Sequence, residues 1–365
     1  MNVKFFDIYK ATPTKKKIFL SIIKSIKNNN FIGGEEVKKF EDNFSKFIGI
    51  KNTISVGNGT DALEIAIKSL NLKKGSEVII PVNTWISTAE AVIANNLKLK
   101  FCDINLDDYT INIKDLERKI SKKTKLIIPV HLYGNAADMK SIRRIAKEKK
   151  IFILEDCAQA HGTMFDGKTV GTFGDVATFS FFPGKNLGAF GDAGAIVTNN
   201  FKISTYCRRD KNHGSLAKYD HKFSGRNSRL DTIQAGILNL KLFNYKKVIK
   251  KRRQLANIYY QELSSLNDIK LFNINKNSFS TYHQFIIRTS SRDRLQKYLF
   301  KKKIQTMIHY PYMLNELPFF KKVNSGKLIN SKNLGNKILS LPISEDHSVN
   351  EIFYVCKIIK KFFNQ

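Results

Sequence analysis

Cysteines are few in this sequence, and long apolar runs are absent. The four cysteines (Cys102, Cys157, Cys207 and Cys356) stand far apart, and none belongs to a Cys-x-x-Cys pair. That spacing argues against a disulfide framework and against a metal site, so we expect a reduced, cytoplasmic protein. The N-terminus lacks the apolar core of a signal peptide, and no apolar run approaches the length of a membrane span.

Acidic residues are also scarce: 31 Asp and Glu against 62 Lys and Arg give a formal net charge of +31. Such an excess favours a nucleic-acid-binding or regulatory protein, the main alternative outside the enzymes. The basic residues, however, form short scattered runs such as 15–17, 250–253 and 301–303. A long basic block and clusters of basic and aromatic residues are both missing. We therefore expect no nucleic-acid partner.

The apolar residues predict an α/β fold. Near-continuous apolar strands alternate with helices, which is typical of a mostly parallel sheet covered on both faces. Such sheets bind ligands at the carboxyl ends of their strands. The expected strands are 53–56, 77–82, 97–101, 125–132, 151–154 and 176–182, and the expected helices include 61–72, 87–94 and 141–150.

The pattern changes after about residue 244, where a long basic helix is expected over 246–264. Strand, helix and strand patterns then follow to the end of the chain. We predict a large domain, 1–245, that includes an N-terminal arm, and a smaller α+β domain, 246–365. The amphipathic stretch 352–363 suits either a membrane-surface helix or packing on the small domain, and we favour packing.

The first candidate site is the glycine-rich segment 57–62, Gly-Asn-Gly-Thr-Asp-Ala, which follows a strand and begins a helix. Small residues and the first helical N–H groups suit a phosphate. A dinucleotide site would need an acid at the end of the second strand, but Glu77 begins its strand. A single-phosphate site therefore fits better, and a simple turn with a helix cap is the structural alternative.

The second candidate is the acidic pair Glu155 and Asp156, which follows an apolar strand. A carboxylate at that position faces the ligand crevice and needs a cationic partner. Strand alternation directs one acid toward the site and the other away. The structural alternative is a helix N-cap.

The third candidate is Lys185, in a Gly/Pro turn after an apolar strand and among aromatic residues. Loss of solvation lowers the pKa of a lysine, as a Schiff-base amine requires. The turn is not a Walker A loop, because Asn186 follows the lysine and Phe179 takes the place of the first glycine.

A phosphate site, a buried acid and a desolvated lysine are together what pyridoxal 5'-phosphate (PLP) requires. The lysine binds the aldehyde, and the acid keeps the pyridine nitrogen protonated so that the ring accepts electrons. Trp85, the one tryptophan, follows a predicted strand and is expected to stack on the ring, with core packing as its alternative.

At this point the sequence resembles the PLP-dependent nucleotide-sugar aminotransferases, the DegT-type family with the aspartate-aminotransferase fold. The resemblance covers nearly the whole chain, through the ordered motifs GNGTDAL, PVNTWISTAEAV, PVHLYG, EDCAQAHG, FSFFPGKNLGAFGDAGAIVT, SGRNSRLDTIQAGIL and IHYP. It implies that Lys185 is the Schiff-base lysine and that Asp156 contacts the ring nitrogen. It also implies that Gln159 lies against the ring, and that Ser180 with Gly59 and Thr60 holds the phosphate.

The resemblance further implies a homodimer with shared active sites, in which Asn227 reaches the phosphate of the neighbouring subunit's cofactor. Some family members have histidine in place of the lysine and act as dehydratases; Lys185 argues against that branch.

The stretch 212–231 resembles the branch that aminates C3 of dTDP-linked 3-keto-6-deoxyhexoses for surface glycans such as the lipopolysaccharide O-antigen. A 4-aminotransferase acting on a UDP- or dTDP-4-keto-6-deoxy sugar is the alternative. The alternatives for the substrate-side residues are a solvated loop, an ion pair with Asp231 and a turn before Pro311. These substrate-side candidates are Tyr219, Arg226, Arg229, His309 and Tyr310.

The expected reaction is a ping-pong amino transfer from L-glutamate to the sugar ketone. Lys185 would move the proton in both halves of the reaction, and Asp156 would stabilise the protonated ring. The anionic substrates would benefit from the positive field of the protein.

Overall fold

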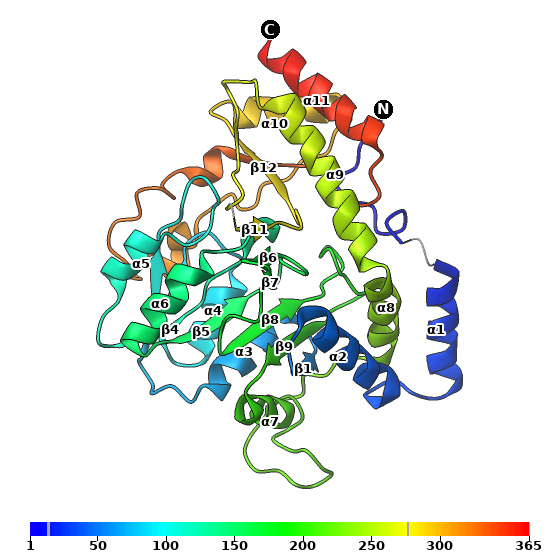
Figure 1. Ribbon diagram of the computed structural model, residues 1–365, viewed down its shortest axis with the longest axis vertical. Coiled ribbons are helices and arrows are strands. Elements are labelled where there is room, and N and C mark those ends of the chain that lie inside the picture. Colours follow the sequence, from blue (N-terminus) through cyan, green and yellow to red (C-terminus); the bar gives the residue numbers. More distant parts are fainter. Residues whose placement is uncertain (13–14, 276, 365) are drawn as a thin grey trace.

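The computed structural model describes residues 1–12, 15–275 and 277–364, and its centre is a seven-stranded sheet in the order β1-β9-β8-β5-β4-β2-β3 (Figure 1). All neighbouring pairs from β8 to β3 are parallel, while β9 runs antiparallel between β1 and β8. The prediction of an α/β fold with a mostly parallel sheet is confirmed. The strands are β1 (Asn52–Val56), β2 (Glu77–Pro81), β3 (Lys98–Cys102), β4 (Thr124–Ile127), β5 (Phe152–Asp156), β8 (Val176–Ser180) and β9 (Gly194–Thr198).

Helices cover both faces of this sheet. Alternate residues of β2 enter different cores: Val78 and Ile80 pack on the side of α3, and Ile79 packs on the side of α2 and α6. Because both faces are buried, the strand has no polar alternation. One face is covered by α3 (Gly59–Ser69), α4 (Ser87–Ala94) and α7 (Phe201–Asp210), and the other by α2 (Gly34–Ile48), α5 (Ile113–Lys119), α6 (Met139–Lys149) and α8 (Thr232–Phe243).

Three strands end two or more residues away from their predicted bounds; the first, β8, ends at Ser180 and not at Phe182. β4 ends at Ile127, five residues early, because Pro129 has no N–H for the ladder and the chain then enters the short helix η1 (Leu132–Gly134). β5 continues through Asp156, so both acids of the pair belong to the strand itself. Strand alternation therefore applies to them directly.

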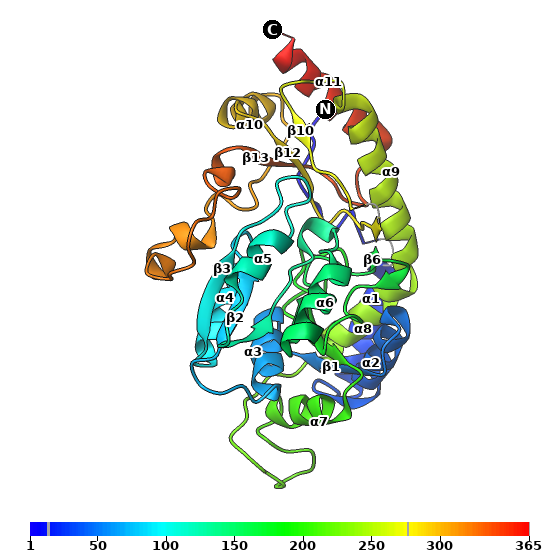
Figure 2. The same ribbon diagram turned by 60° about the vertical axis from the view of Figure 1, so that its left-hand side comes forward.

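The chain beyond α8 builds a second, smaller layer (Figure 2). Its three-stranded sheet has the order β10-β12-β13. The proposed domain division at 245/246 coincides with the start of α9 and stays a prediction. The elements are α9 (Tyr245–Leu263), β10 (Lys270–Leu271), β12 (Phe285–Arg288), α10 (Arg292–Lys301), η2 (Leu314–Glu316), η3 (Pro318–Phe320), η4 (Leu334–Asn336), β13 (Ile338–Leu341) and α11 (Val349–Phe363); a third small sheet joins β6 (Met164–Phe165), β7 (Lys168–Thr169) and β11 (Ser278–Phe279).

The C-terminal helix α11 packs on α9 and buries Ile352, Val355 and Ile359. Packing thus accounts for its apolar face, as favoured above. Within the described ranges, no helix combines the length and the apolar character needed to cross a membrane.

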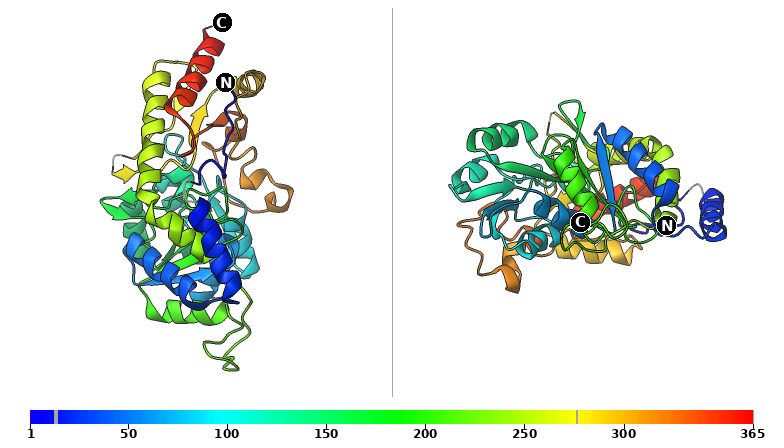
Figure 3. Two further views of the ribbon diagram at one scale, coloured as in Figure 1. Left: turned by 90° about the vertical axis from the view of Figure 1, so that its right-hand side faces the viewer. Right: turned by 90° about the horizontal axis from the view of Figure 1, so that it is seen from below.

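The N-terminal residues lie beside the smaller layer. The Val3 N–H donates to the Lys303 carbonyl at 2.9 Å, and His347 Nε2 contacts the Lys4 carbonyl at 2.9 Å. Through these contacts, the first residues of the predicted N-terminal arm pack against the predicted small domain. Helix α1 (Lys15–Lys27) then runs along the outer side of α8 (Figure 3).

Candidate active site

Three motifs of the sequence meet at the carboxyl ends of β5 and β8. Asp156, the last residue of β5, pairs in register with Thr178 of β8. β8 ends at Ser180, and the turn with Lys185 follows. The glycine-rich segment joins them because β9 begins at Gly194, where a Cβ would lie only 2.3 Å from the Asn58 carbonyl oxygen.

The Asp156 carboxylate is buried and held at both oxygens. Its Oδ1 accepts the Ala158 N–H at 3.1 Å, and its Oδ2 accepts the Thr88 hydroxyl at 2.9 Å. Burial raises the pKa of Asp156, while these two donors and the charge of Lys185 oppose the rise. Asp156 ends a strand, so the alternative of a helix N-cap is wrong.

Glu155 points away from the site, as alternation predicts. Its carboxylate accepts three backbone N–H groups, from Gly171, Phe173 and Gly174, at 2.7–2.8 Å. His131 donates through Nε2 at 3.0 Å, because its Nδ1 accepts the Ala137 N–H. This acid therefore ties the 171–174 loop to the sheet.

We expect Glu155→Gln to destabilise the protein by about 3 kcal/mol, because its NH₂ group would face N–H donors that are left without an acceptor. Urea unfolding of the variant measures this loss. A midpoint equal to that of the wild type would contradict the structural role.

Lys185 lies in a desolvated position within the turn. Burial lowers its pKa to about 8, and the charge of Asp156 partly opposes that shift. The backbone N–H of Lys185 donates to the Phe182 carbonyl at 2.8 Å, and this bond closes the turn. The expectation of a lysine with a lowered pKa is met by this geometry.

Two contacts from distant elements hold the lysine turn. The Asn186 carboxamide donates to the Thr281 carbonyl at 3.2 Å and accepts from His283 Nδ1 at 3.0 Å. Lys241 of α8 donates to the Gly188 carbonyl at 2.7 Å. The turn is therefore anchored to both layers of the molecule.

Only the neutral Lys185 amine reacts with PLP, and its pKa is about 8. The rate of PLP uptake by the apoprotein should therefore increase about tenfold for each unit by which the pH is raised toward 8, and stay constant at higher pH. Stopped-flow absorbance between pH 6 and 10 measures this rate. Nα-acetyllysine, whose amine has an ordinary pKa near 10.4, is the control for the titration of PLP itself. A rate that still rises above pH 9 would contradict the lowered pKa.

The start of α3 forms a close-fitting turn, which is the predicted phosphate cradle. A Cβ at Gly59 would lie 2.7 Å from the Ser180 Cβ, so only glycine lets the helix start approach that hydroxyl. The Thr60 and Ser87 hydroxyls are 2.8 Å apart. Asn58 also caps α3 by accepting the Asp61 N–H. The segment thus includes a helix cap, and the N–H groups at the start of α3 also suit the predicted phosphate.

Gln159, Tyr310 and Trp85 form one wall of the site. Gln159 accepts the Tyr133 N–H at 2.8 Å and donates to the Tyr310 hydroxyl at 2.9 Å. The Trp85 ring is 58% exposed and lies 5.6 Å from the Tyr310 ring, centroid to centroid. Its exposure rules out the alternative of core packing and leaves the indole face available.

His309 adjoins this wall. Its carbonyl accepts the Tyr133 hydroxyl, and its Nδ1 contacts the Ser340 hydroxyl at 2.7 Å. Burial, aided by the charge of Lys185, lowers its pKa to about 4. A neutral imidazole therefore lies beside Tyr310 in this wall.

Arg226, a predicted substrate-side residue, is engaged in ion pairs, but not with Asp231, the partner named in the structural alternative. Its Nη1 lies 2.6 Å from Glu64 and 3.3 Å from Asp61, and its Nε lies 3.7 Å from Asp210. Asp61 and Glu64 take the place of Asp231 because the 226–228 segment packs on α3, which carries both acids.

The other candidates on this segment lie apart from the Lys185 wall. Tyr219 is 81% exposed and belongs to the loop that follows α7 (Figure 1). Asn227 is exposed and precedes Ser228, whose hydroxyl donates to Asp61 of α3. Arg229 lines a cavity of about 280 Å³ with Arg208 and Lys211. Within one subunit, these residues are not brought against the lysine.

Sequence reasoning missed several residues that contact the site. Thr88 binds Asp156, and His283 binds Asn186. His161 is buried beside Phe179 and Phe181, and burial with the Lys185 charge lowers its pKa to about 3. For Thr88 the sequence offers only a weak signal, which is its place in the first turn of a helix that follows the carboxyl end of β2. His283 has no local signal, since it comes from the other layer.

These residues fit PLP. A desolvated amine, a buried carboxylate held at both oxygens and a cradle too tight for a Cβ converge on one site. They would hold the aldehyde, the ring nitrogen and the phosphate, respectively.

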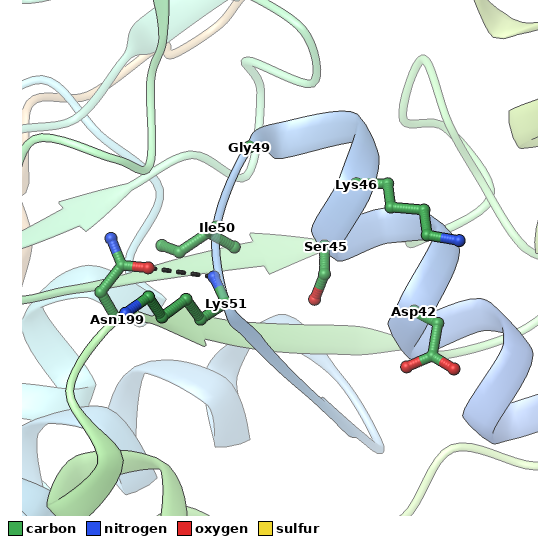
Figure 4. A pocket seen from close by; sticks show the side chains of 7 residues that line it. All are labelled: Asp42, Ser45, Lys46, Gly49, Ile50, Lys51 and Asn199. Atoms are coloured by element: carbon green, nitrogen blue, oxygen red, sulfur yellow. Dashed lines mark hydrogen bonds between the residues drawn. The ribbon is translucent and has the colours of Figure 1, made fainter.

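A separate hollow lies at the opposite edge of the sheet, between the end of α2, the start of β1 and the end of β9 (Figure 4). There Asn199 accepts the Lys51 N–H at 2.9 Å. β9 runs antiparallel to β8, so its end lies far from the lysine turn. This hollow takes no part in the site.

Comparison with known proteins agrees with this geometry. The sequence model of the DegT/DnrJ/EryC1/StrS aminotransferase family matches residues 13–360. The chain is 38% identical to the dTDP-3-amino-3,6-dideoxy-alpha-D-galactopyranose transaminase of Aneurinibacillus thermoaerophilus, over 95% of this chain and 96% of that relative. It is 35% identical to the UDP-N-acetyl-3-dehydro-alpha-D-glucosamine 3-aminotransferase of Acidithiobacillus ferrooxidans, over 96% and 94% of the two chains.

Among solved structures, the crystal structure of Streptomyces venezuelae DesV in complex with a ketimine intermediate superposes with a TM-score of 0.97 and 32% identity. The match covers 100% of this chain and 99% of DesV. The aspartate-aminotransferase-like fold expected from the resemblance is thereby confirmed. The chain belongs to the DegT/DnrJ/EryC1/StrS aminotransferase family and is a PLP-dependent nucleotide-sugar aminotransferase.

Proposed function

We propose that this enzyme transfers the amino group of L-glutamate to the C3 ketone of a dTDP-3-keto-6-deoxyhexose, giving a dTDP-3-amino-3,6-dideoxyhexose. The similarity over 95% of the chain to a relative named for a dTDP-3-amino-3,6-dideoxy sugar carries this choice. The four cysteines are all buried and free, which supports the proposed cytoplasmic location.

When bound, PLP supplies an electron sink that stabilises negative charge at the carbon beside the amino nitrogen. Lys185 Nζ, with its lowered pKa, is suited to remove the proton from the α-carbon of glutamate and later to deliver a proton to C3 of the sugar. The Asp156 carboxylate, held by Thr88 and Ala158, keeps the ring nitrogen protonated. Lys185 and Asp156 are thus the proposed catalytic residues.

The sugar is proposed to bind on the wall formed by Trp85, Tyr310 and His309, which adjoins Gln159. Arg226 is left out of this proposal because its guanidinium already pairs with Asp61 and Glu64. Tyr219, Asn227 and Arg229 are proposed to act across the subunit boundary. The loop after α7, to which Tyr219 belongs, projects from the body of the chain (Figure 2), and the Arg229 carbonyl lies close to Gly57.

A homodimer is supported by an apolar surface that continues to the lysine turn. Four large side chains of α1 are exposed, among them Phe19 at 61% and Ile23 at 47%. A groove of about 390 Å³ lined by Ile8, Tyr9, Phe19, Pro183 and Phe190 joins this helix to the turn. Exposed apolar surface of this kind marks an interface.

We expect the double variant Phe19→Glu, Ile23→Glu to convert the dimer into monomers, because two carboxylates would be buried without partners. Sedimentation velocity measures the mass. Phe300→Glu, on an exposed α10 side chain, is the control and should stay dimeric. An unchanged mass for the double variant would place the interface elsewhere.

The substrate proposal is tested with enzyme converted to its pyridoxamine form by glutamate and then desalted. Candidate keto sugars are added one at a time while the visible absorption of the pyridoxal form is recorded. Its return with a dTDP-3-keto-6-deoxyhexose supports the proposal. Return with only a UDP- or dTDP-4-keto sugar would show amination at C4 instead.

A further inference from the structure

Two buried threonines, Thr84 and Thr88, form a chain of hydrogen bonds that ends at the Asp156 carboxylate. They are 4% and 1% exposed. The Thr88 hydroxyl lies 2.9 Å from Asp156 Oδ2, and the Thr84 and Thr88 hydroxyl oxygens are 3.1 Å apart.

The direction of this chain follows from the chemistry of its end. An ionised carboxylate only accepts, so the single hydroxyl proton of Thr88 goes to Asp156. The Thr88 oxygen must then accept the proton of Thr84. Successive hydrogen bonds of one direction polarise each other, so both hydroxyl dipoles favour the negative charge of Asp156.

These hydrogen bonds oppose the unfavourable burial of the ionised Asp156 carboxylate. Burial favours the neutral form of Asp156, and a neutral carboxyl group cannot stabilise a protonated ring nitrogen. The Ala158 N–H holds Oδ1, and the Thr88 hydroxyl holds Oδ2. Together they also fix the plane of the carboxylate.

Helix α4 gives Thr88 a rigid position. Thr88 is the second residue of this helix, and Ser87 beside it contacts the Thr60 hydroxyl of the phosphate cradle. The Trp85 carbonyl accepts the Thr88 N–H at 3.2 Å. The same turn therefore positions contacts to the ring face, the phosphate and the acid.

We propose that Thr88 is a positioning residue that keeps the Asp156 carboxylate ionised and oriented toward the cofactor nitrogen, with Thr84 reinforcing it. This inference rests on the proposed role of Asp156.

The test compares Thr88→Val, which has nearly the same shape but no hydroxyl, with Thr88→Ser, which keeps the hydroxyl. Equilibrium dialysis of the apoproteins measures the dissociation constant for pyridoxamine phosphate. Thr88→Val should bind about tenfold more weakly, because a hydrogen bond to a charged group is lost. Thr88→Ser should stay within about twofold of the wild type.

A double-mutant cycle separates this role from general packing. In an Asp156→Asn background the carboxylate is gone, so adding Thr88→Val should weaken binding no further. Urea midpoints of the apoproteins check folding, and Thr88→Ala replaces the valine variant if that variant does not fold.

Equal affinities for Thr88→Val and Thr88→Ser would overturn the role of the Thr88 hydroxyl. The same tenfold loss in both backgrounds would also overturn it. Wild-type affinity of Asp156→Asn alone would instead show that Asp156 does not contact the ring nitrogen, and the basis of the inference would fail.

Discussion

Replacing Lys185 by alanine should lower turnover by about 10⁴-fold or more, which corresponds to at least ~5 kcal/mol of transition-state stabilisation. The reason is that the variant loses both the covalent attachment of the cofactor and the amine that moves the proton. Single-turnover absorbance with glutamate measures this rate on protein reconstituted with PLP. Retained turnover would contradict the role of Lys185.

Lys241 offers a matched control, since burial lowers its pKa to about 8 as well. Its amine binds the Gly188 carbonyl and lies over the Phe190 ring, 4.6 Å from the centroid. We expect Lys241→Met to keep turnover within about tenfold of the wild type, because the variant loses only an anchor of the turn. Equal losses for both lysines would show that the loss of turnover in Lys185→Ala does not identify Lys185 as the catalytic amine.

Replacing Asp156 by alanine should lower kcat by about 10³-fold, or ~4 kcal/mol, because the ring nitrogen loses the charge that keeps it protonated. Asp156→Asn keeps the shape and should show nearly the same loss. Steady-state kinetics with glutamate and the keto sugar measures both variants. Near-normal rates would show that another group holds the ring nitrogen.

Substitutions at Asp156 and at Glu155 should differ in their effect on the stability of the apoprotein. Burial raises the pKa of Asp156 in the folded protein, so between the unfolded and folded values the native state binds more protons than the unfolded chain. Its contribution to the stability of the apoprotein therefore falls as pH rises through that range. At neutral pH, the free energy of unfolding of apo Asp156→Asn should lie within about 1 kcal/mol of the wild-type value or exceed it. Glu155→Gln should be clearly less stable than the wild type.

Local patterns in the sequence were sufficient for the main features of the large domain. Continuous apolar strands predicted a sheet buried on both faces, as Val78, Ile79 and Ile80 show. Alternation along β5 correctly predicted that Glu155 and Asp156 point in opposite directions. Such features depend on a few neighbouring residues, so one chain reveals them.

The ends of the strands were less predictable, because a strand ends where its neighbour no longer provides backbone hydrogen-bond partners. β4 lost five predicted residues at Pro129, and β5 gained the two acids. The pairing of Arg226 with Asp61 and Glu64, in place of Asp231, likewise follows from the packing of one segment on a helix far away in sequence.

By itself, the sequence determined the fold class, and it predicted the lysine, the acid and the phosphate segment of the site, because each lies in a motif with a local physical signature. Only the tertiary structure decided what supports them. Thr88 meets Asp156 across 68 residues, and His283 meets Asn186 across 97. Contacts over such separations leave no periodic trace in the sequence, since they arise when the sheet and the smaller layer close around the site.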